Sequence, residues 1–215
     1  MARKINPHQS LRGKLNLNFK SKPNMKYPDL NPIAQKAHES AKSKGFYEET
    51  PNVGQLFMLI ISELSEALEA DRKGRTYNHS LHGYPLTLTS VSDWDFKELV
   101  KDTVEDEIAD AVIRILDFCG YYGQVINLSR YAHMGDFEVV EGENLGSVLL
   151  DVTSQICKSR AEFASPDDGE FEAHLHAALL LLFNLSSARG FDLMWHIRMK
   201  MEYNATRPTK HGKCY

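Results

Sequence analysis

The chain of 215 residues is long enough for one or two domains with a sizeable apolar core. Its 42% hydrophobic and 25% charged residues are ordinary for a globular protein, and its formal net charge of −4 argues against nucleic acid as the main partner. No stretch approaches the roughly 20 apolar residues of a membrane span, and the first residues contain no apolar signal core. We therefore expect a protein without a membrane partner.

Residues 1–28 carry seven basic side chains and no acid. They lack the apolar periodicity of a helix, which favours a flexible arm. A contact with phosphates or with a partner subunit is the alternative. The basic residues are Arg3, Lys4, Arg12, Lys14, Lys20, Lys22 and Lys26.

The remainder, residues 29–215, reads as a single all-α domain because its apolar residues recur at helical spacing. Pro32 suits the first turn of one helix, and Asn52 suits the N-cap of the next. Gly45 and Gly74 are expected stops. Residues 75–97 break the pattern and predict a loop with a small hairpin at 86–89. The predicted helices cover about 31–45, 52–73, 95–119, 144–163, 168–188 and 191–207.

Two pairs of carboxylates stand out on the helices predicted at 52–73 and 95–119. Glu63 and Glu66 are three residues apart, as are Glu107 and Asp110. Residues three apart lie on the same side of a helix. If the two helices pack antiparallel, four acids converge near the seam without a counter-charge, which is costly unless a cation binds them.

Oxygen-only ligands suit Mg²⁺, with Mn²⁺ as a substitute, rather than zinc. A di-iron bundle would place a histidine three residues after a glutamate, and no histidine here has that spacing. A solvated acidic face is the alternative to a metal site. His79 and His82 also form a spaced pair, which we interpret as coincidence in a loop.

Three segments resemble the MazG-like branch of the all-α nucleoside triphosphate pyrophosphohydrolases, a superfamily related to the dimeric dUTPases and the dCTP pyrophosphatases. They are "KAHESAKSKGFYEE…GQLFMLIISELSEALEADRKG", "VEDEIADAVIRILDF" and "KMEYNATRPTKHGKCY". The resemblance implies Mg²⁺-dependent hydrolysis of a nucleoside triphosphate to the monophosphate and pyrophosphate. It also implies that the metal-binding and catalytic acids are Glu63, Glu66, Glu107 and Asp110. The 40 residues between Glu66 and Glu107 exceed the spacing of compact members, which leaves the base open.

Substrate contacts are expected on both sides of the acids. Lys200, Asn204 and Arg207 fall on one stripe of the last helix and suit a triphosphate tail. A solvated basic terminus is the alternative. The candidates for base contact are His38, Phe46 and Tyr47, because the corresponding region of related enzymes stacks on the nucleobase, with Trp94 as a further candidate. Core packing is the alternative for Phe46.

An internal repeat is the last feature. Residues 53–66 align with 145–158, and residues 107–123 align with 174–190. Glu63, Glu66, Glu107 and Asp110 then fall on Gln155, Lys158, His174 and Ala177. A degenerate duplication would give a four-helix core and one metal site within one chain, a monomeric pseudo-dimer. A true homodimer fits the sequence as well.

Cys119, Cys157 and Cys214 are odd in number, and two of them lie in apolar helical patterns. This favours reduced thiols and a cytoplasmic location. The rival to an enzyme is a non-catalytic helical module that senses nucleotides or binds another protein.

Overall fold

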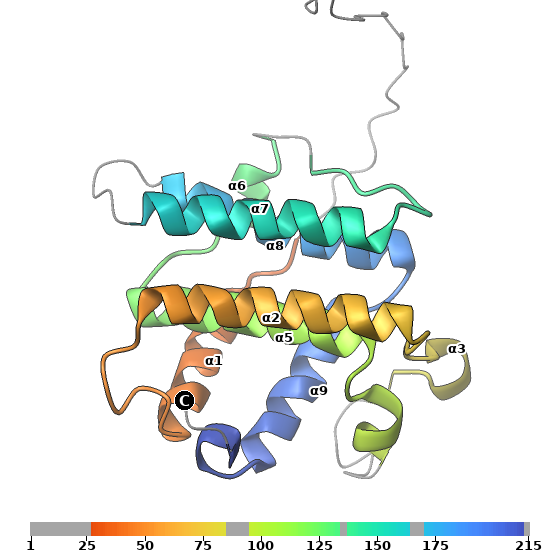
Figure 1. Ribbon diagram of the computed structural model, residues 1–215, viewed down its shortest axis with the longest axis horizontal. Coiled ribbons are helices and arrows are strands. Elements are labelled where there is room, and N and C mark those ends of the chain that lie inside the picture. The colour runs from red at the N-terminus through yellow and green to blue at the C-terminus, as the bar shows by residue number, and fades with distance from the viewer. Residues whose placement is uncertain (1–26, 85–94, 134–136, 164–169, 213–215) are drawn as a thin grey trace, which may run out of the picture.

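The computed structural model describes residues 27–84, 95–133, 137–163 and 170–212, and these ranges are helical without a strand. Figure 1 shows long helices stacked in layers. The long helices are α1 (Asn31–Ser43), α2 (Val53–Arg72), α5 (Val104–Tyr122), α7 (Leu145–Glu162), α8 (Glu170–Arg189) and α9 (Leu193–Thr206). The short ones are α3 (His79–His82), η1 (Phe96–Val100), α6 (Leu128–Tyr131) and η2 (Thr209–Gly212). The all-α prediction is confirmed.

Nearly all of the basic arm at 1–28, the hairpin at 86–89, Trp94 and Cys214 lie outside the described residues. By length and composition, no single helix within the described ranges could cross a membrane. One pair of helices is long and apolar enough when its two members are taken together. The pair consists of Phe171–Arg189 and Leu193–Thr206, which are bent by 111° relative to each other.

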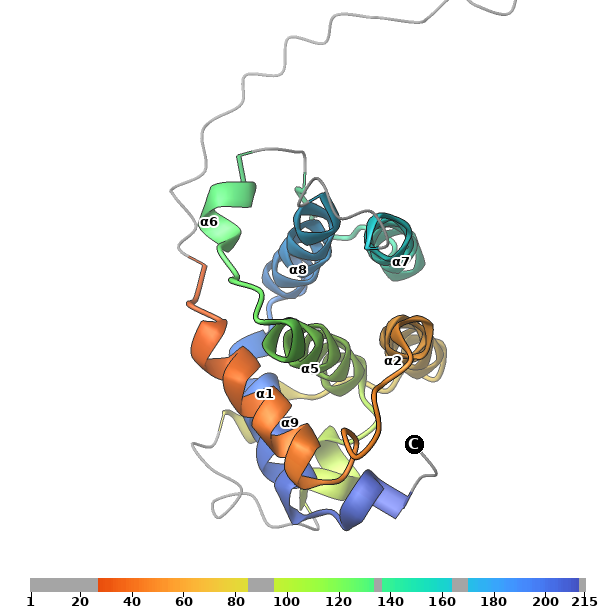
Figure 2. The ribbon, with the colours of Figure 1, turned by 90° about the vertical axis from the view of Figure 1, so that its left-hand side faces the viewer.

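Four helices, α2, α5, α7 and α8, form the core, seen nearly end-on in Figure 2. Helices α2 and α5 run antiparallel, so that Phe57 near the start of α2 meets Phe118 near the end of α5, with ring centroids 5.0 Å apart. Helices α7 and α8 pack against each other and cover the back of this pair. The predicted four-helix core is therefore present within one chain.

The apolar lines predicted from the sequence form the core. Ile60, Leu64 and Ala67 of α2 are buried, and so are the apolar residues of α5 from Val104 to Cys119 apart from the half-buried Ile113. Helix α8 is buried around most of its circumference, because the run from 177 to 182 has apolar side chains on every face. Its role is packing, as its sequence indicated.

Helices α1 and α9 cross the opposite face of α5 (Figure 2). The approach of α1 is close at Gly120, where an added Cβ would lie 2.6 Å from the Ala34 carbonyl oxygen and 2.8 Å from the His38 Cβ. The face of the α2–α5 pair that is not covered by α7 and α8 is thus enclosed by α1 and α9.

The third helix begins later than predicted. A continuous helix from about residue 95 was expected, but the π-helical turn η1 ends at Val100 and Asp102 adopts a left-handed φ of 61°. Thr103 is the N-cap of α5, and its hydroxyl accepts from the Asp106 N–H. A threonine before a run of acids is a sequence signal for this start, and the apolar periodicity across 95–103 obscured it.

The two helix pairs share local features that support the duplication hypothesis. Asn52 and Asn144, which immediately precede the aligned segments 53–66 and 145–158, are the N-caps of α2 and α7. Gly123 and Gly190, which also align, follow α5 and α8 with φ values of 65° and 75°. Both positions require a residue that tolerates the left-handed region.

The close approach at Gly120 yields a stability prediction. Gly120→Ala should lower the free energy of unfolding by about 1–3 kcal/mol, because the backbone of α1 must move to admit a methyl group. Urea unfolding would measure the change. Gly146→Ala is the matched control, since its added Cβ meets only side-chain atoms, at 3.2 and 3.6 Å. Equal stability changes in the two variants would contradict the close packing of α1 on α5.

Candidate functional site

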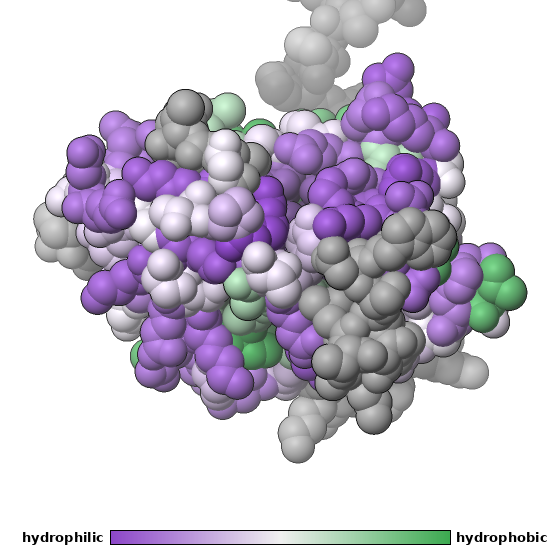
Figure 3. Space-filling view, turned by 90° about the horizontal axis from the view of Figure 1, so that it is seen from below, coloured by the Kyte–Doolittle hydropathy of each residue, from purple (hydrophilic) through white to green (hydrophobic). Residues whose placement is uncertain are grey.

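A cavity of about 660 Å³ lies between α1, α2, α5 and α9. The segment 44–52, the turn at 101–102 and residues 207–210 complete its wall. Its volume falls within the range of small-molecule sites. Figure 3 views the molecule from this side, and hydrophilic residues predominate on the face. All four carboxylates predicted from the sequence line this cavity.

Three of the four predicted acids form a compact group. One carboxylate oxygen each from Glu63, Glu107 and Asp110 lies within 4.8 Å of the other two, a spacing at which they could hold a metal ion. Glu63 and Glu107 are only 4% and 3% exposed. Glu66 also lines the cavity but is exposed and outside this group. The antiparallel packing of α2 and α5 is what brings the three acids together.

The acids do not lack counter-charges, which corrects the expectation from the sequence. Arg114 Nε lies 2.5 Å from Glu63 Oε1. Lys200 Nζ lies 2.6 Å from Asp106 Oδ2 and 2.7 Å from Asp110 Oδ2. Four carboxylates, those of Asp106 and the three-acid group, thus face two cations. When all are ionised, two negative charges remain uncompensated, and one divalent cation would balance them.

The pKa values show that burial, together with the neighbouring acids, disfavours ionisation of these carboxyl groups. Burial raises the pKa of Glu107 to about 9, and the neighbouring acids add to the effect although Lys200 opposes it. Burial followed by the charge of Asp110 raises the pKa of Glu63, despite Arg114. Burial also raises the pKa of Asp106, to about 6. A site in which a buried carboxyl group such as that of Glu107 holds its proton at neutral pH favours a bound cation.

The beginning of α5 supplies part of the compensation. Glu105, Asp106 and Glu107 occupy its first turn, where the helix dipole favours negative charge. Glu105 points to a different neighbour, since its Oε2 accepts from the Tyr77 N–H at 2.9 Å. Asp106 was not predicted as a site residue, although it sits between two acids in the sequence.

The three residues predicted to hold phosphates all line the cavity, but in different ways. Lys200 is 3% exposed, and its ammonium is held by Asp106 and Asp110 rather than lying on a solvated stripe. Asn204 is half-buried on α9, and Arg207 is the C-cap residue beyond the end of that helix. The Lys44 ammonium donates to the backbone oxygens of Ala205 and Arg207, which fixes this end of α9 against α1.

Two of the three residues predicted to contact a base lie in the cavity wall, and the third lies outside it. Phe46 and Tyr47 line the cavity, whereas His38 does not appear in its wall. His38 lies behind Tyr47, with ring centroids 4.6 Å apart, and its Nδ1 is 3.1 Å from Asp117 Oδ1. Tyr47 stacks on Tyr121 at 4.8 Å. His38 therefore supports the aromatic wall of the cavity, which Phe46 and Tyr47 form.

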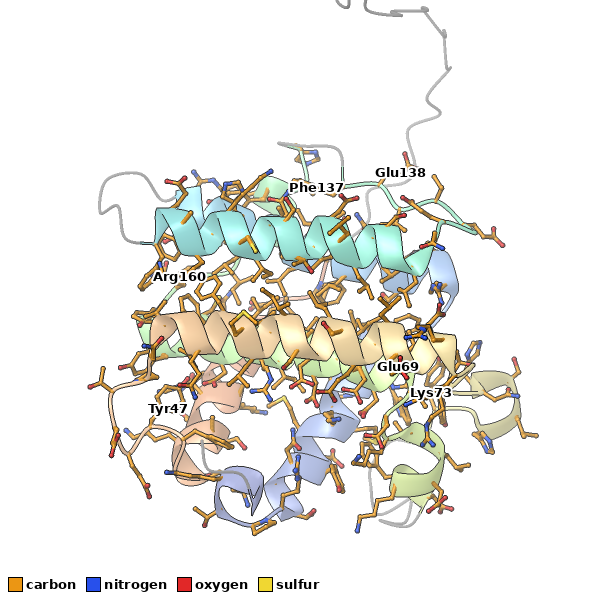
Figure 4. The ribbon with its side chains drawn as sticks, in the orientation of Figure 1. Tyr47, Glu69, Lys73, Phe137, Glu138 and Arg160 are labelled. Carbon is orange, nitrogen blue, oxygen red and sulfur yellow. The ribbon has the colours of Figure 1, made fainter. Side chains whose placement is uncertain are left out.

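The aromatic wall and the core lie on opposite sides of α2. Figure 4 shows Tyr47 on the side of α1 and α9, whereas Phe137 and Arg160 lie on the side of α7 and α8. Glu69 and Lys73 mark the other end of α2 and pair with each other at 3.3 Å. The cavity thus has acids near its middle, aromatic rings towards the segment 44–52 and basic groups towards the end of α9.

No protein-family model, curated protein or solved structure significantly matches this chain.

The raised pKa of Glu107 predicts how metal-free stability depends on pH. The folded state retains the Glu107 proton up to about pH 9, whereas the ordinary pKa is 4.5, so the folded state binds more protons between these values. Stability from this group is complete below about pH 4.5 and declines as pH rises towards 9. The free energy of unfolding of the chelator-treated protein should therefore fall more steeply with pH than that of Glu107→Gln.

Urea unfolding at intervals from pH 5 to 9 would measure both profiles. Glu69→Gln, a change at an acid outside the cavity, should follow the wild-type profile. Parallel profiles for the wild type and Glu107→Gln would contradict the raised pKa.

Proposed function

We propose that the protein is a Mg²⁺-dependent nucleoside triphosphate pyrophosphohydrolase, related to the MazG-like enzymes that its motifs resemble. The observation that carries the proposal is the group of Glu63, Glu107 and Asp110 in a cavity that also has aromatic and basic walls. This combination suits a ligand with a flat base and a negatively charged phosphate tail. The proposed products are the nucleoside monophosphate and pyrophosphate.

The donor set fits Mg²⁺ or Mn²⁺, because the group offers only carboxylate oxygens. The two uncompensated negative charges fit a divalent ion as well. Bound there, such an ion would neutralise phosphate charge and make a water molecule more acidic. Phosphoryl transfer otherwise asks the protein mainly for positioning and electrostatic stabilisation.

The chain's own residues supply the positioning. The Arg114 guanidinium fixes Glu63 through its short ion pair. Glu63 is thereby engaged, so we assign the attacking water to Glu66, which lines the cavity outside the three-acid group. Glu66 would orient that water and accept its proton.

The phosphate tail would lie towards Asn204 and Arg207, with the basic side chains of Lys44 and Lys210 in the same part of the wall. The Lys200 ammonium, which lies beside Asp106 and Asp110, would add its positive charge to the attraction of the phosphate tail. The base would stack against Phe46 or Tyr47, with Tyr121 behind the latter.

We also propose an oligomeric state and a cellular compartment for the protein. Its four-helix core comes from one chain, which supports a monomeric pseudo-dimer, with the homodimer as the alternative. Cys119 and Cys157 are free thiols in the structure, in keeping with the reducing cytoplasm. The proposed role there is housekeeping of the nucleotide pool.

A decisive experiment is pyrophosphate release from a panel of ribo- and deoxyribonucleoside triphosphates with Mg²⁺. Glu107→Gln should reduce the rate at least 100-fold, since it removes a charged metal ligand while keeping the side-chain volume. Glu69→Gln should retain wild-type activity, because that acid is outside the cavity. Circular dichroism would confirm that both variants are folded.

The panel also separates the rival functions. Orthophosphate instead of pyrophosphate would contradict the proposed cleavage point. A wild-type protein that binds nucleotides but releases neither product would favour the sensing module. Full activity in Glu107→Gln would contradict the assignment of the site.

A further inference from the structure

We propose that Asp106 is a positioning residue that holds the Lys200 ammonium and thereby leaves Asp110 available to a metal ion. The inference rests on the metal site of the proposed function but not on the reaction. Asp106 is neither part of the three-acid group nor part of the cavity wall. It acts on the site through Lys200.

Asp106 is the most enclosed acid of the site. Its side chain is 0% exposed, in the first turn of α5. Its Oδ2 accepts from the Lys200 ammonium at 2.6 Å and from the Asp102 N–H at 3.0 Å. This one oxygen therefore connects α9, α5 and the left-handed turn at the cavity rim.

Lys200 creates a conflict at Asp110. The ammonium lies 2.7 Å from Asp110 Oδ2, on the same carboxylate that a metal would use. An ammonium and a divalent cation on one carboxylate repel each other strongly in a buried site. Lys200 is itself buried, so it needs an anionic partner when the metal takes Asp110.

The unused oxygen of Asp106 provides that partner. Asp106 Oδ1 is buried and, among the residues described, has no hydrogen-bond donor. An ammonium has three N–H donors, and one of them already points to the other oxygen of this carboxylate. When Lys200 leaves Asp110, Asp106 can accept from it with both oxygens. A buried acceptor without a donor is costly, which argues for such an exchange.

Titration of the full chain with Mn²⁺ alone, followed by calorimetry and electron paramagnetic resonance, tests the proposal. In Asp106→Asn the charged neighbours left to the ammonium are Asp110 and Glu107, which both belong to the metal site. The Mn²⁺ dissociation constant should therefore rise about 10- to 100-fold, the usual cost of removing a residue that supports a metal ligand. Glu105→Gln is the matched control. It is a buried acid of the same turn without a contact to Lys200, and its Mn²⁺ affinity should remain within about threefold of wild type.

The double variant Asp106→Asn/Lys200→Met distinguishes positioning from a purely structural role. It removes the competing ammonium and leaves no unpaired charge at the pair. If Asp106 acts through Lys200, the double variant should bind Mn²⁺ within about threefold of wild type. A structural role predicts the same loss in both variants. Thermal unfolding of each variant would show that binding is measured on folded protein.

The outcomes are distinct from those of the activity panel. Wild-type Mn²⁺ affinity in a folded Asp106→Asn would overturn the inference, and so would an equal loss in the double variant. If Asp106→Asn does not fold, the double variant decides alone by the same comparison with wild type. Failure of the wild type to bind Mn²⁺ would overturn this inference and the metal site together. Absence of pyrophosphate release, with Mn²⁺ binding as expected, would contradict only the proposed reaction.

Discussion

The packing of α2 against α5 places buried carboxylates within a few ångströms of one another, and the arrangement around them follows from this constraint. Carboxylates in an apolar interior either hold protons, pair with cations or bind a metal. The structure shows the first two responses, in the raised pKa of Glu107 and in the ion pairs of Arg114 and Lys200. With Glu107 protonated, three carboxylates still face two cations, and the remaining negative charge makes the site receptive to a divalent cation.

The other long helices cover the two faces of the α2–α5 pair, one apolar and one polar. Helices α7 and α8 cover its apolar face, so their contribution is burial of hydrophobic surface. Helices α1 and α9 cover the polar face and must leave room for a cavity. Gly120 brings α1 close to α5, and the Lys44 bonds to the end of α9 tie the two covering helices together. The cavity is thus bounded by fixed elements, as a binding site requires.

Periodicity and capping predicted the helices, and residue spacing predicted four converging acids, of which Glu63, Glu107 and Asp110 form the compact group. The later start of α5 was missed because Val100 and Val104 keep the apolar spacing although the backbone breaks between them. The position of Lys200 was missed for another reason. Its spacing from Asn204 indicates a shared stripe, but only tertiary packing turns that stripe towards Asp106 and Asp110. Long-range pairing of this kind leaves no local signal in a single sequence.

Helices α7 and α8 pack against each other without the buried acids of α2 and α5. By the alignment, the place of the Glu63–Glu107 pair is taken by Gln155 and His174, and Gln155 Oε1 lies 2.8 Å from His174 Nδ1. The same alignment places leucine at 181 on Arg114, and one residue before its start it places alanine at 173 on Asp106. Neutral and apolar side chains therefore suffice for two antiparallel helices to pack in this chain. Since packing does not require the acids of α2 and α5, their presence at these positions argues for a ligand that does.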